Sequence, residues 1–460
     1  MRIAAALMAL AFLAGCAAPP ESAARRAPQS VDLPPMKTFS SYKPGPVRGS
    51  NRQLAADFMD LSFRMESGRP LETFTRFEGP VRVAVRAQGT PPPTLSPDLA
   101  RLIDRLQREA GIDIARAGLG ETPQIVIETL PRRQIQRFVP QAACFVVPNV
   151  GSWREFVRYR RSDRVNWTKL ETRTLAAIFI PNDVSPQEVR DCLHEEVAQA
   201  LGPLNDLYRL ENSVFNDDNF HPVLTSFDML MLRITYAPEL RSGMSPGDVE
   251  ARLPGILARL NPAGQQRGPA RPSNERRDWI EAIEAALGPG TPSRQRAGKA
   301  VDAVRIAEQA GFNDTRLAFS YFALGRLALA SDPDLSFASF VQAGGLYTEA
   351  SGTEVQQAHV TMQIAAFALT TGQAETALRL VNSALPAVQQ SENAALLSTL
   401  LMMKAEALDL LGRQSEGQAV RLDSLGWARY GIGDDAQVRA RLAEIASLPP
   451  PGLRQGGQGS

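Results

Sequence analysis

The sequence predicts an α+β domain followed by an all-α domain of helical repeats. In the first half of the chain, short runs typical of β-strands alternate with amphipathic helical patterns. A segment rich in glycine and proline follows at 262–273, and only helical patterns, rich in alanine and leucine, continue to 448. The 460 residues suffice for two domains, which we expect at 49–261 and 274–448.

The N-terminus has the pattern of a secretory signal, residues 1–16. Met1-Arg2 is followed by an apolar run, Ile3 to Leu13, that ends in Leu13-Ala14-Gly15-Cys16. The run is shorter than the ~20 residues that span a bilayer. The end resembles a bacterial lipobox. That resemblance implies cleavage before Cys16, lipidation of Cys16 and anchoring in a membrane. An ordinary signal peptide or a short anchor is the alternative.

Ala17 rather than aspartate follows the cysteine, which by resemblance to sorting rules favours the outer membrane, facing the periplasm. Residues 17–48 are rich in Pro, Ala, Ser and Arg and predict a flexible tether. The tail at 449–460 has a composition that predicts disorder. The net charge of +1 and the lack of a long basic run exclude a nucleic-acid partner.

The first domain should contain two helices and four strands before its central helix. The predicted helices cover 51–65 and 96–110, the second with Ser96-Pro97 as cap and first residue. The predicted strands cover 81–85, 124–128, 143–147 and 175–180. The last strand is almost continuously apolar, which is typical of a strand covered on both faces.

The central helix begins at Ser185-Pro186-Gln187-Glu188, which has the residues of a capping box with proline in the first turn. Val189, Leu193 and Val197 form its apolar face. Gly202-Pro203 ends it, because proline cannot continue a helix and glycine accepts unusual backbone angles.

The end of this helix carries a resemblance to a known family. The stretch reads Glu195-Glu196-Val197-Ala198-Gln199-Ala200-Leu201-Gly202-Pro203-Leu204-Asn205. It resembles the metzincin motif His-Glu-x-x-His-x-x-Gly-x-x-His, with Glu196 at the general-base position and Gly202 at the turn. The three zinc-ligand positions hold Glu195, Gln199 and Asn205, and Asp206 follows. The resemblance implies a twisted mixed sheet packed against an active-site-type helix.

Downstream residues extend the resemblance. Ser213-Val214-Phe215-Asn216-Asp217 resembles the metzincin turn beneath the metal, with Ser213 and Asn216 matching and Phe215 in place of methionine. A helix then begins near Thr225, with Asp228 at its third position. The Glu-Glu-x-x-Gln-x-Leu-Gly core also resembles an uncharacterised family of proteobacterial lipoproteins.

The replaced ligands argue against zinc chemistry, because zinc prefers imidazole and thiolate to the oxygens of Gln and Asn. We therefore expect no cofactor and no peptidase activity. A calcium or magnesium site formed by Glu195, Gln199, Asn205 and Asp206 is chemically allowed. The plainer alternative is that Glu195, Gln199 and Asn205 hydrogen-bond one another. Glu196 is either a surviving general base or a structural carboxylate.

Other polar residues near this motif have simpler interpretations. His194 is expected at the surface or in a supporting role, rather than as a ligand. The acidic residues of the following loop attract a cation or a basic peptide, or form a solvated loop: Asp206, Glu211, Asp217 and Asp218.

Three cysteines occur, and lipidation of Cys16 leaves Cys144 and Cys192. In an oxidising compartment this pair predicts a disulfide that closes a loop of 48 positions. Two buried thiols are the alternative.

The second domain shows a weak repeat. Gly372 and Gly412, both at turn positions, are 40 positions apart, and Asp332-Pro333 marks a turn 40 positions earlier. The pattern resembles tetratricopeptide-type helical hairpins. That resemblance implies a concave surface for an unknown protein or peptide. The alternative is a bundle that only packs on the first domain.

Together these features predict an envelope lipoprotein with a non-catalytic metzincin-like domain and a helical domain for binding a protein or peptide. A divergent metal-dependent hydrolase with Glu196 as general base is the alternative. A purely structural role in envelope assembly is the third possibility.

Overall fold

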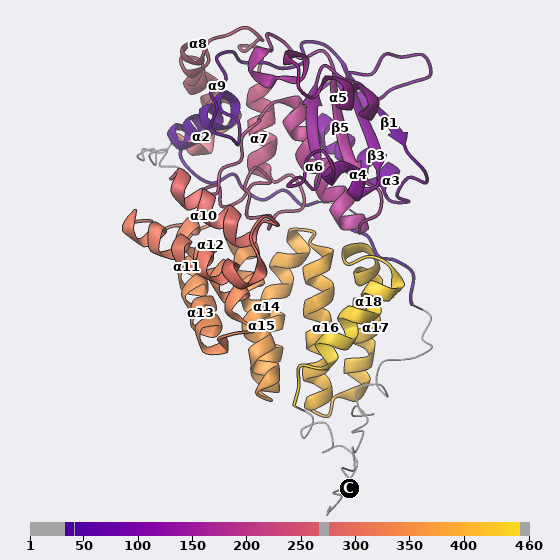
Figure 1. The fold of residues 1–460 in the computed structure, drawn as a ribbon, viewed down its shortest axis with the longest axis vertical. Helices are drawn as coiled ribbons and strands as arrows, with labels where there is room; N and C mark the ends of the chain where they lie inside the picture. The colour runs from indigo at the N-terminus through magenta and orange to yellow at the C-terminus, as the bar shows by residue number, and fades with distance from the viewer. Residues whose placement is uncertain (1–32, 41, 266–275, 451–460) are drawn as a thin grey trace, which may run out of the picture.

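The computed structural model describes residues 33–40, 42–265 and 276–450 (Figure 1). An α/β region with a five-stranded mixed sheet is followed by an all-α region of paired, packed helices. The predicted fold class is therefore confirmed. The signal segment with Cys16, most of the predicted linker and almost all of the predicted tail lie outside the described residues.

The sheet has the strand order β2-β1-β3-β5-β4. All neighbouring strands are parallel except the edge strand β4, which pairs with β5 in the antiparallel sense. The strands are β1 (Val81–Ala87), β2 (Ile114–Arg116), β3 (Ile125–Leu130), β4 (Phe145–Pro148) and β5 (Ala176–Pro181). Every residue of β3 and β5 is buried, as the apolar run at 175–180 predicted for β5. The short strand β2 was not predicted.

The helices of this region lie on both faces of the sheet. The side chains of Ile127 and Ile178 belong to the core shared with α3 and α6, whereas Phe179 packs with Trp153 of α5 and Ile135 of α4. The helices are α2 (Asn51–Phe63), α3 (Leu95–Arg105), α4 (Arg132–Gln136), α5 (Trp153–Tyr159), α6 (Pro186–Leu201), α7 (Ser226–Thr235), α8 (Pro246–Glu250) and α9 (Leu253–Leu260).

Helix α3 differs from its prediction at both ends. It begins at Leu95 after Thr94, so Ser96 lies inside the helix and does not cap it. Its last turn continues as a π-helix, Leu106–Ala110, that ends at Gly111 with a φ of 70°. Short helical turns complete the region: 3-10 helices at Asp163–Val165, Trp167–Lys169 and Pro262–Gly264.

Helix α6 is the predicted central helix, and its apolar residues Val189, Leu193 and Val197 are fully buried. Ser185 Oγ accepts the backbone N–H of Glu188 at 3.2 Å, as a helix cap does. The Glu188 side chain, however, forms an ion pair with Arg132 of α4 and does not complete the expected capping box.

The reason for glycine at 202 also differs from the prediction. The residue has a φ of −167°, which any amino acid adopts. An added Cβ would lie 2.9 Å from the Thr235 side chain of α7. Close packing of α7 therefore requires glycine here.

The helical region contains nine helices within residues 276–450: α10 (Arg277–Leu287), α11 (Ser293–Gln309), α12 (Thr315–Ala328), α13 (Pro333–Glu349), α14 (Glu354–Thr370), α15 (Ala374–Gln390), α16 (Ala394–Leu410), α17 (Gln414–Gly431) and α18 (Asp435–Ala446). Asp332 caps α13, while Gly372 and Gly412 turn the chain with φ values of 74° and 75°. The predicted turns thus join α12 to α13, α14 to α15 and α16 to α17.

Residues 33–40 and 42–48, which we call the N-terminal strap, contact both regions although a flexible tether was expected there. The backbone N–H of Lys37 donates to the Gly426 carbonyl at 2.9 Å, and the Phe39 ring lies 4.6 Å from that of Trp427. The Arg105 guanidinium lies 3.9 Å from the centre of the Tyr42 ring. The aromatic residues of the strap therefore hold it against α17 and α3, which composition alone did not indicate.

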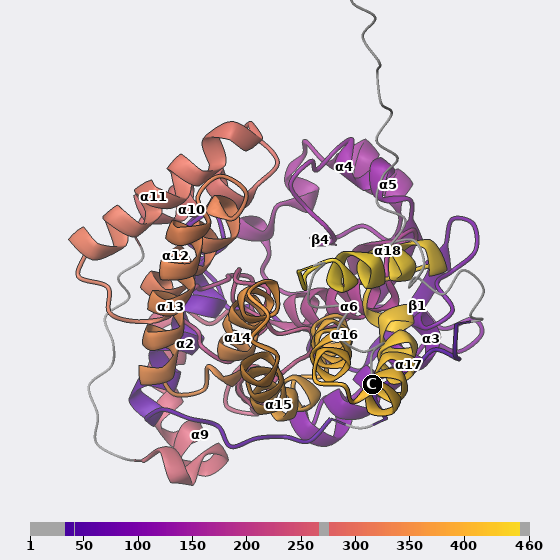
Figure 2. The same cartoon turned by 90° about the horizontal axis from the view of Figure 1, so that it is seen from below.

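The helical region packs against α6, which lies behind α16 and α17 in the view from below (Figure 2), and the contacts involve the N-terminal half of α6. Arg190 Nη1 lies 3.0 Å from Glu392 Oε2, and both side chains are buried. Gln187 Nε2 donates to Asn393 Oδ1 at 3.2 Å. Tyr430 Oη donates to Asp98 Oδ2 of α3 at 3.0 Å. The two regions thus share a buried polar interface.

Candidate functional site

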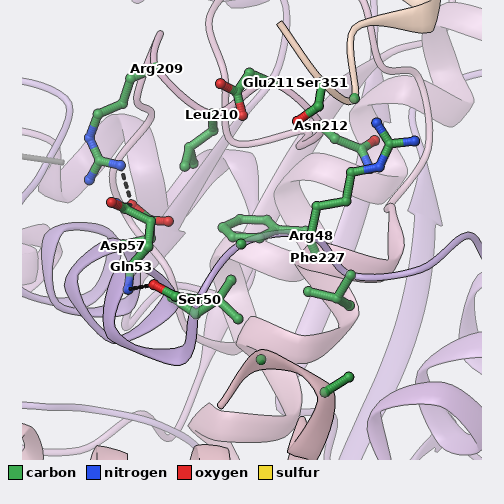
Figure 3. A pocket seen from close by; sticks show the side chains of 16 residues that line it. Arg48, Ser50, Gln53, Asp57, Arg209, Leu210, Glu211, Asn212, Phe227 and Ser351 are labelled. Atoms are coloured by element: carbon green, nitrogen blue, oxygen red, sulfur yellow. Dashed lines mark hydrogen bonds and ion pairs between the residues drawn. The ribbon is translucent and has the colours of Figure 1, made fainter. Parts of the chain in front are cut away.

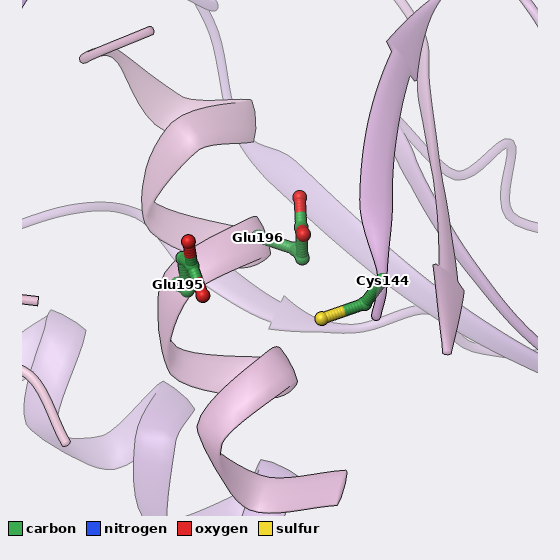
Figure 4. A group of neighbouring side chains, drawn as sticks. All are labelled: Cys144, Glu195 and Glu196. Atoms are coloured by element: carbon green, nitrogen blue, oxygen red, sulfur yellow. The ribbon is translucent and has the colours of Figure 1, made fainter. Parts of the chain in front are cut away.

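The side chains of Glu195 and Glu196 on α6 lie near Cys144 (Figure 4). Cys144, just before β4, is bonded to Cys192 of α6, with an S–S distance of 2.07 Å and a Cα–Cα distance of 5.9 Å. The predicted disulfide is therefore formed. Cys144 Sγ and carboxylate oxygens of Glu195 and Glu196 all lie within 4.8 Å of one another. The bridge holds the sheet edge against the helix at the point where the two carboxylates lie.

Glu196 is the most deeply placed of these carboxylates. Its side chain is 4% exposed, and its buried Oε2 atom has no hydrogen-bond partner among the described residues. Burial, together with the charges of Glu195 and Glu66, raises its pKa well above the usual value. Glu195 is half-buried, and burial, with the charges of Glu66 and Asp217, raises its pKa to about 8.

Two further carboxylates extend the group toward solvent. Gln199 Nε2 donates to Asp206 Oδ2 at 3.2 Å, and Glu66, in the exposed turn after α2, lies beside both residues. Burial is the chief cause that raises the pKa of Asp206 well above its usual value. We call Glu66, Glu195, Glu196 and Asp206 the carboxyl cluster. Glu66 was missed by sequence reasoning, because it lies outside the motif and nothing local marks it.

The three residues at the ligand positions of the resemblance do not hydrogen-bond one another. Glu195 belongs to the carboxyl cluster, and Gln199 contacts it through Asp206. Asn205 is buried, and its Nδ2 donates to the Asp60 carbonyl at 3.0 Å. The side chain of Asn205 is therefore used to join the loop after α6 to α2.

The three histidines lie outside the carboxyl cluster. His194 is buried rather than exposed, and its Nδ1 accepts the backbone N–H of Leu224 at 3.1 Å. His221 Nε2 lies 3.2 Å from the Glu211 carbonyl oxygen, and burial lowers its pKa to about 4. The His359 ring lies 4.6 Å from that of Phe220. These side chains support loops and helix packing.

The turn at 213–217 is tied to α7. Ser213 Oγ donates to Asp228 Oδ1 at 2.5 Å and accepts the N–H of Phe215 at 2.9 Å. Phe215 is fully buried. Thr225 and Asp228 form the complete capping box of α7, as the predicted positions of both residues suggested. The turn is therefore a packed element of the core.

Part of the acidic loop is buried, although a solvated loop was one of the two interpretations of its sequence. Asn216 Nδ2 donates to the Leu210 carbonyl at 2.6 Å and to Asp218 Oδ2 at 2.9 Å. Asp218 is buried, and burial raises its pKa to about 8.

Arg173 holds the end of α6 and was not singled out from the sequence. Its Nη1 donates to the carbonyls of Gln199 at 2.6 Å and Ala200 at 2.8 Å, and its Nη2 donates to that of Gly202. A cation at this end also interacts favourably with the helix dipole. Arg173 thereby positions the helix end that carries the carboxyl cluster.

Two cavities with shared lining residues lie along the strap. The first, about 640 Å³, lies between the strap, α2 and the loop at 209–212 (Figure 3). The second, about 630 Å³, lies between the strap, α14 and α15. Arg48, Asn212 and Gly352 line both cavities, which together we call the interdomain groove. Arg209 pairs with Asp57 at its wall, and Arg48 pairs with Glu354 at 2.8 Å across it.

The fold and these sites define a two-region protein, in which an α/β region with a disulfide-braced carboxyl cluster precedes paired helices. Residues 51–255 match the family described as "Protein of unknown function (DUF2927)". The match covers the sheet, α6 and the whole carboxyl cluster, while the helical region lies outside it. No curated protein and no solved structure matches the chain.

The disulfide indicates an extracytoplasmic location, because such bonds persist mainly in oxidising compartments. Within the described residues, none of the helices has the length and apolar character needed to cross a membrane.

Proposed function

We propose that the chain is a lipid-anchored envelope protein that binds a peptide or a segment of another protein in the interdomain groove. Lipidation of Cys16 would hold it at the outer membrane, facing the periplasm. The observation that carries the proposal is the pair of cavities along the strap. Each has the 300–1,000 Å³ size common for ligand pockets.

The lining of the second cavity suits an extended peptide. Gln357 and Thr361 of α14 and Ser383 and Gln390 of α15 supply amide and hydroxyl groups, while Ala358 and Ala384 supply small apolar contacts. Such a mixture of polar and apolar groups can pair with a peptide backbone and accept its side chains. The resemblance to tetratricopeptide-type hairpins supports the same class of ligand.

The α/β region is proposed to be a degenerate metzincin. Its mixed sheet beside α6 is the arrangement that the resemblance implies. Glu195, Gln199 and Asn205 supply oxygen and amide groups where that family has imidazoles, and Asn205 bonds the Asp60 carbonyl. These features favour binding over zinc-dependent hydrolysis.

Site-specific photocrosslinking in intact cell envelopes tests the binding proposal. A benzoylphenylalanine at Gln357 or Ser383, inside the groove, is expected to give a discrete crosslinked species. The same group at Glu375, on α15 but outside the cavity lining, serves as the control. Equal crosslinking at all three positions, or none at the two groove positions, would contradict the proposal.

The alternative function, hydrolysis with Glu196 as general base, is favoured by one observation. A buried carboxylate with a raised pKa and an unpartnered oxygen is typical of catalytic acids and bases. Elemental analysis of the purified chain and peptide-library digestion by wild type and Glu196→Gln test it. Stoichiometric zinc together with hydrolysis that Glu196→Gln abolishes would replace the binding proposal.

A further inference from the structure

The carboxyl cluster contains buried oxygen atoms without partners. Glu196 is more than nine-tenths buried, yet its Oε2 atom has no hydrogen-bond partner among the described residues, and the same is true of Asp206 Oδ1. An unpaired buried carboxylate is costly, and a native structure rarely retains one without a reason. Figure 4 shows Glu196 extending from α6 on the side of the helix where Cys144 lies, and an oxygen of Glu196 lies within 4.8 Å of one of Glu195.

Among the described residues, the charges that act most strongly on these groups include no positive one. The charged side chains that act most strongly on Glu195, Glu196 and Asp206 are all acidic and come from three segments. They are the other members of the carboxyl cluster and Asp217 of the loop before α7. Glu284 of α10, whose charge also acts on Glu66, is acidic too. Four carboxyl groups thus meet without a basic partner in the described part of the chain.

We propose that the carboxyl cluster binds one calcium ion, with Glu195, Glu196, Asp206 and Glu66 as ligands. Gln199 holds Asp206 in place through its amide. Calcium takes six to eight oxygen ligands, and its bonds of about 2.3–2.6 Å place opposite ligands about 4.6–5.2 Å apart. Oxygens of Glu195 and Glu196 that lie within 4.8 Å of each other fit this spacing.

The donor set also selects against other metals. Magnesium requires ligands at about 2.0–2.1 Å in a nearly ideal octahedron, and Glu195 and Glu196, adjacent on one helix, offer little freedom to meet that demand. Zinc prefers nitrogen and sulfur ligands. The sulfur of Cys144 lies close to the pair, but its disulfide bond with Cys192 leaves no thiolate to coordinate a metal.

The ligands come from three segments: the turn after α2, helix α6 and the loop that follows α6. An ion bound to all three would join them and would neutralise charge that no side chain of the cluster neutralises. Because the ion binds the folded state, calcium should raise the free energy of unfolding by RT ln(1 + [Ca²⁺]/Kd). This site does not involve the interdomain groove, so failure of peptide binding leaves the calcium proposal standing.

Calorimetric titration of the chelator-treated, oxidised full chain with CaCl₂ tests the proposal. We expect one ion per chain and an unfolding midpoint that rises with calcium concentration, with a smaller rise for MgCl₂. Glu196→Gln and Asp206→Asn should each weaken binding at least tenfold. Glu250→Gln, which removes an exposed carboxylate of α8, is the matched control and should bind as wild type does.

Loss of binding can be separated from loss of folding. Glu196→Gln keeps the side-chain shape and replaces a buried carboxyl that only a bound proton keeps neutral, so its unfolding midpoint without calcium should equal or exceed that of wild type. The proposal is overturned if 10 mM calcium produces neither heat nor a shift. It is also overturned if both variants bind as wild type, or if a lysine-rich peptide binds the cluster and calcium does not.

Discussion

Glu195 and Glu196 show how the surroundings of a residue change its chemistry. In the unfolded chain both carboxyls ionise near pH 4.3, as exposed glutamates do. In the folded protein, burial and acidic neighbours raise the pKa of Glu195 to about 8 and that of Glu196 well above its usual value. The folded protein therefore keeps protons that the unfolded chain has released.

This difference predicts that stability falls as pH rises from 6.5 to 9 in the presence of chelator. A carboxyl whose pKa is raised by folding stabilises the protein below its unfolded pKa, and that stability is lost as pH rises through the folded pKa. For Glu195 the loss ends near pH 8 and proceeds at up to about 1.4 kcal/mol per pH unit. Urea unfolding at several pH values measures the slope.

The histidines do not cause the fall in stability between pH 6.5 and 9. Burial lowers the pKa values of His194, His221 and His359, so folding disfavours their protonation only below about pH 6.5. Glu195→Gln and Glu196→Gln should reduce the slope, and Glu250→Gln should not. A flat or rising stability across the window, or an unchanged slope in both cluster variants, would refute this account.

At the scale of the element, α6 serves a different purpose at each end. Its first half packs against the helical region through Gln187 and Arg190. Cys192 lies near its middle, and its second half carries two members of the carboxyl cluster. The end of the helix depends on Arg173, because that guanidinium supplies the donors for three backbone carbonyls.

We predict that Arg173→Met lowers the free energy of unfolding by about 3 kcal/mol, because buried carbonyls of the last turn lose charged donors. Arg173→Lys should fall between this variant and wild type, since one ammonium cannot reproduce the planar donor arrangement. Chemical denaturation measures both. Arg161→Met, on the exposed surface, is the control, and an Arg173→Met effect no larger than that control would count against the capping role.

At the scale of the whole molecule, a buried ion pair joins the two regions. Burial raises the pKa of Glu392, while Arg190 acts in the opposite direction. Glu392 has a φ of 54°, so the chain adopts a left-handed turn to present it to α6. The strap crosses the same junction, where the Arg190 guanidinium lies 5.6 Å from the centre of the Phe39 ring.

Arg190→Met is expected to weaken the interface by about 3–5 kcal/mol, because it leaves Glu392 buried without its partner. Calorimetry should then show a separate unfolding transition for each region, whereas the two regions of the wild type should unfold in one transition. Adding Glu392→Gln should restore part of the loss, because the double variant has no unpaired charge. Arg441→Met breaks an exposed pair with Glu444 and should change stability by at most about 1 kcal/mol. Identical profiles for Arg190→Met and Arg441→Met would contradict the role of the buried pair.

The sequence by itself determined the elements whose signals are local. The Ser185 cap, the apolar face of α6 and the turns at Asp332, Gly372 and Gly412 each depend on a few neighbouring residues, and all were found correctly. Strand β2 and helices α4 and α5 were missed, because three to seven residues are too few for a periodic pattern.

Only the tertiary structure decided the sites. Glu66 joins Asp206 across the fold, Arg173 reaches the end of α6, and two cavities lie along the strap. Each depends on side chains from distant segments, and no periodicity or cap encodes such a meeting. The motif could place Glu195 and Glu196 on one helix. Their burial, their raised pKa values and the unbalanced charge around them arise from packing, because desolvation and charge depend on every segment that surrounds them.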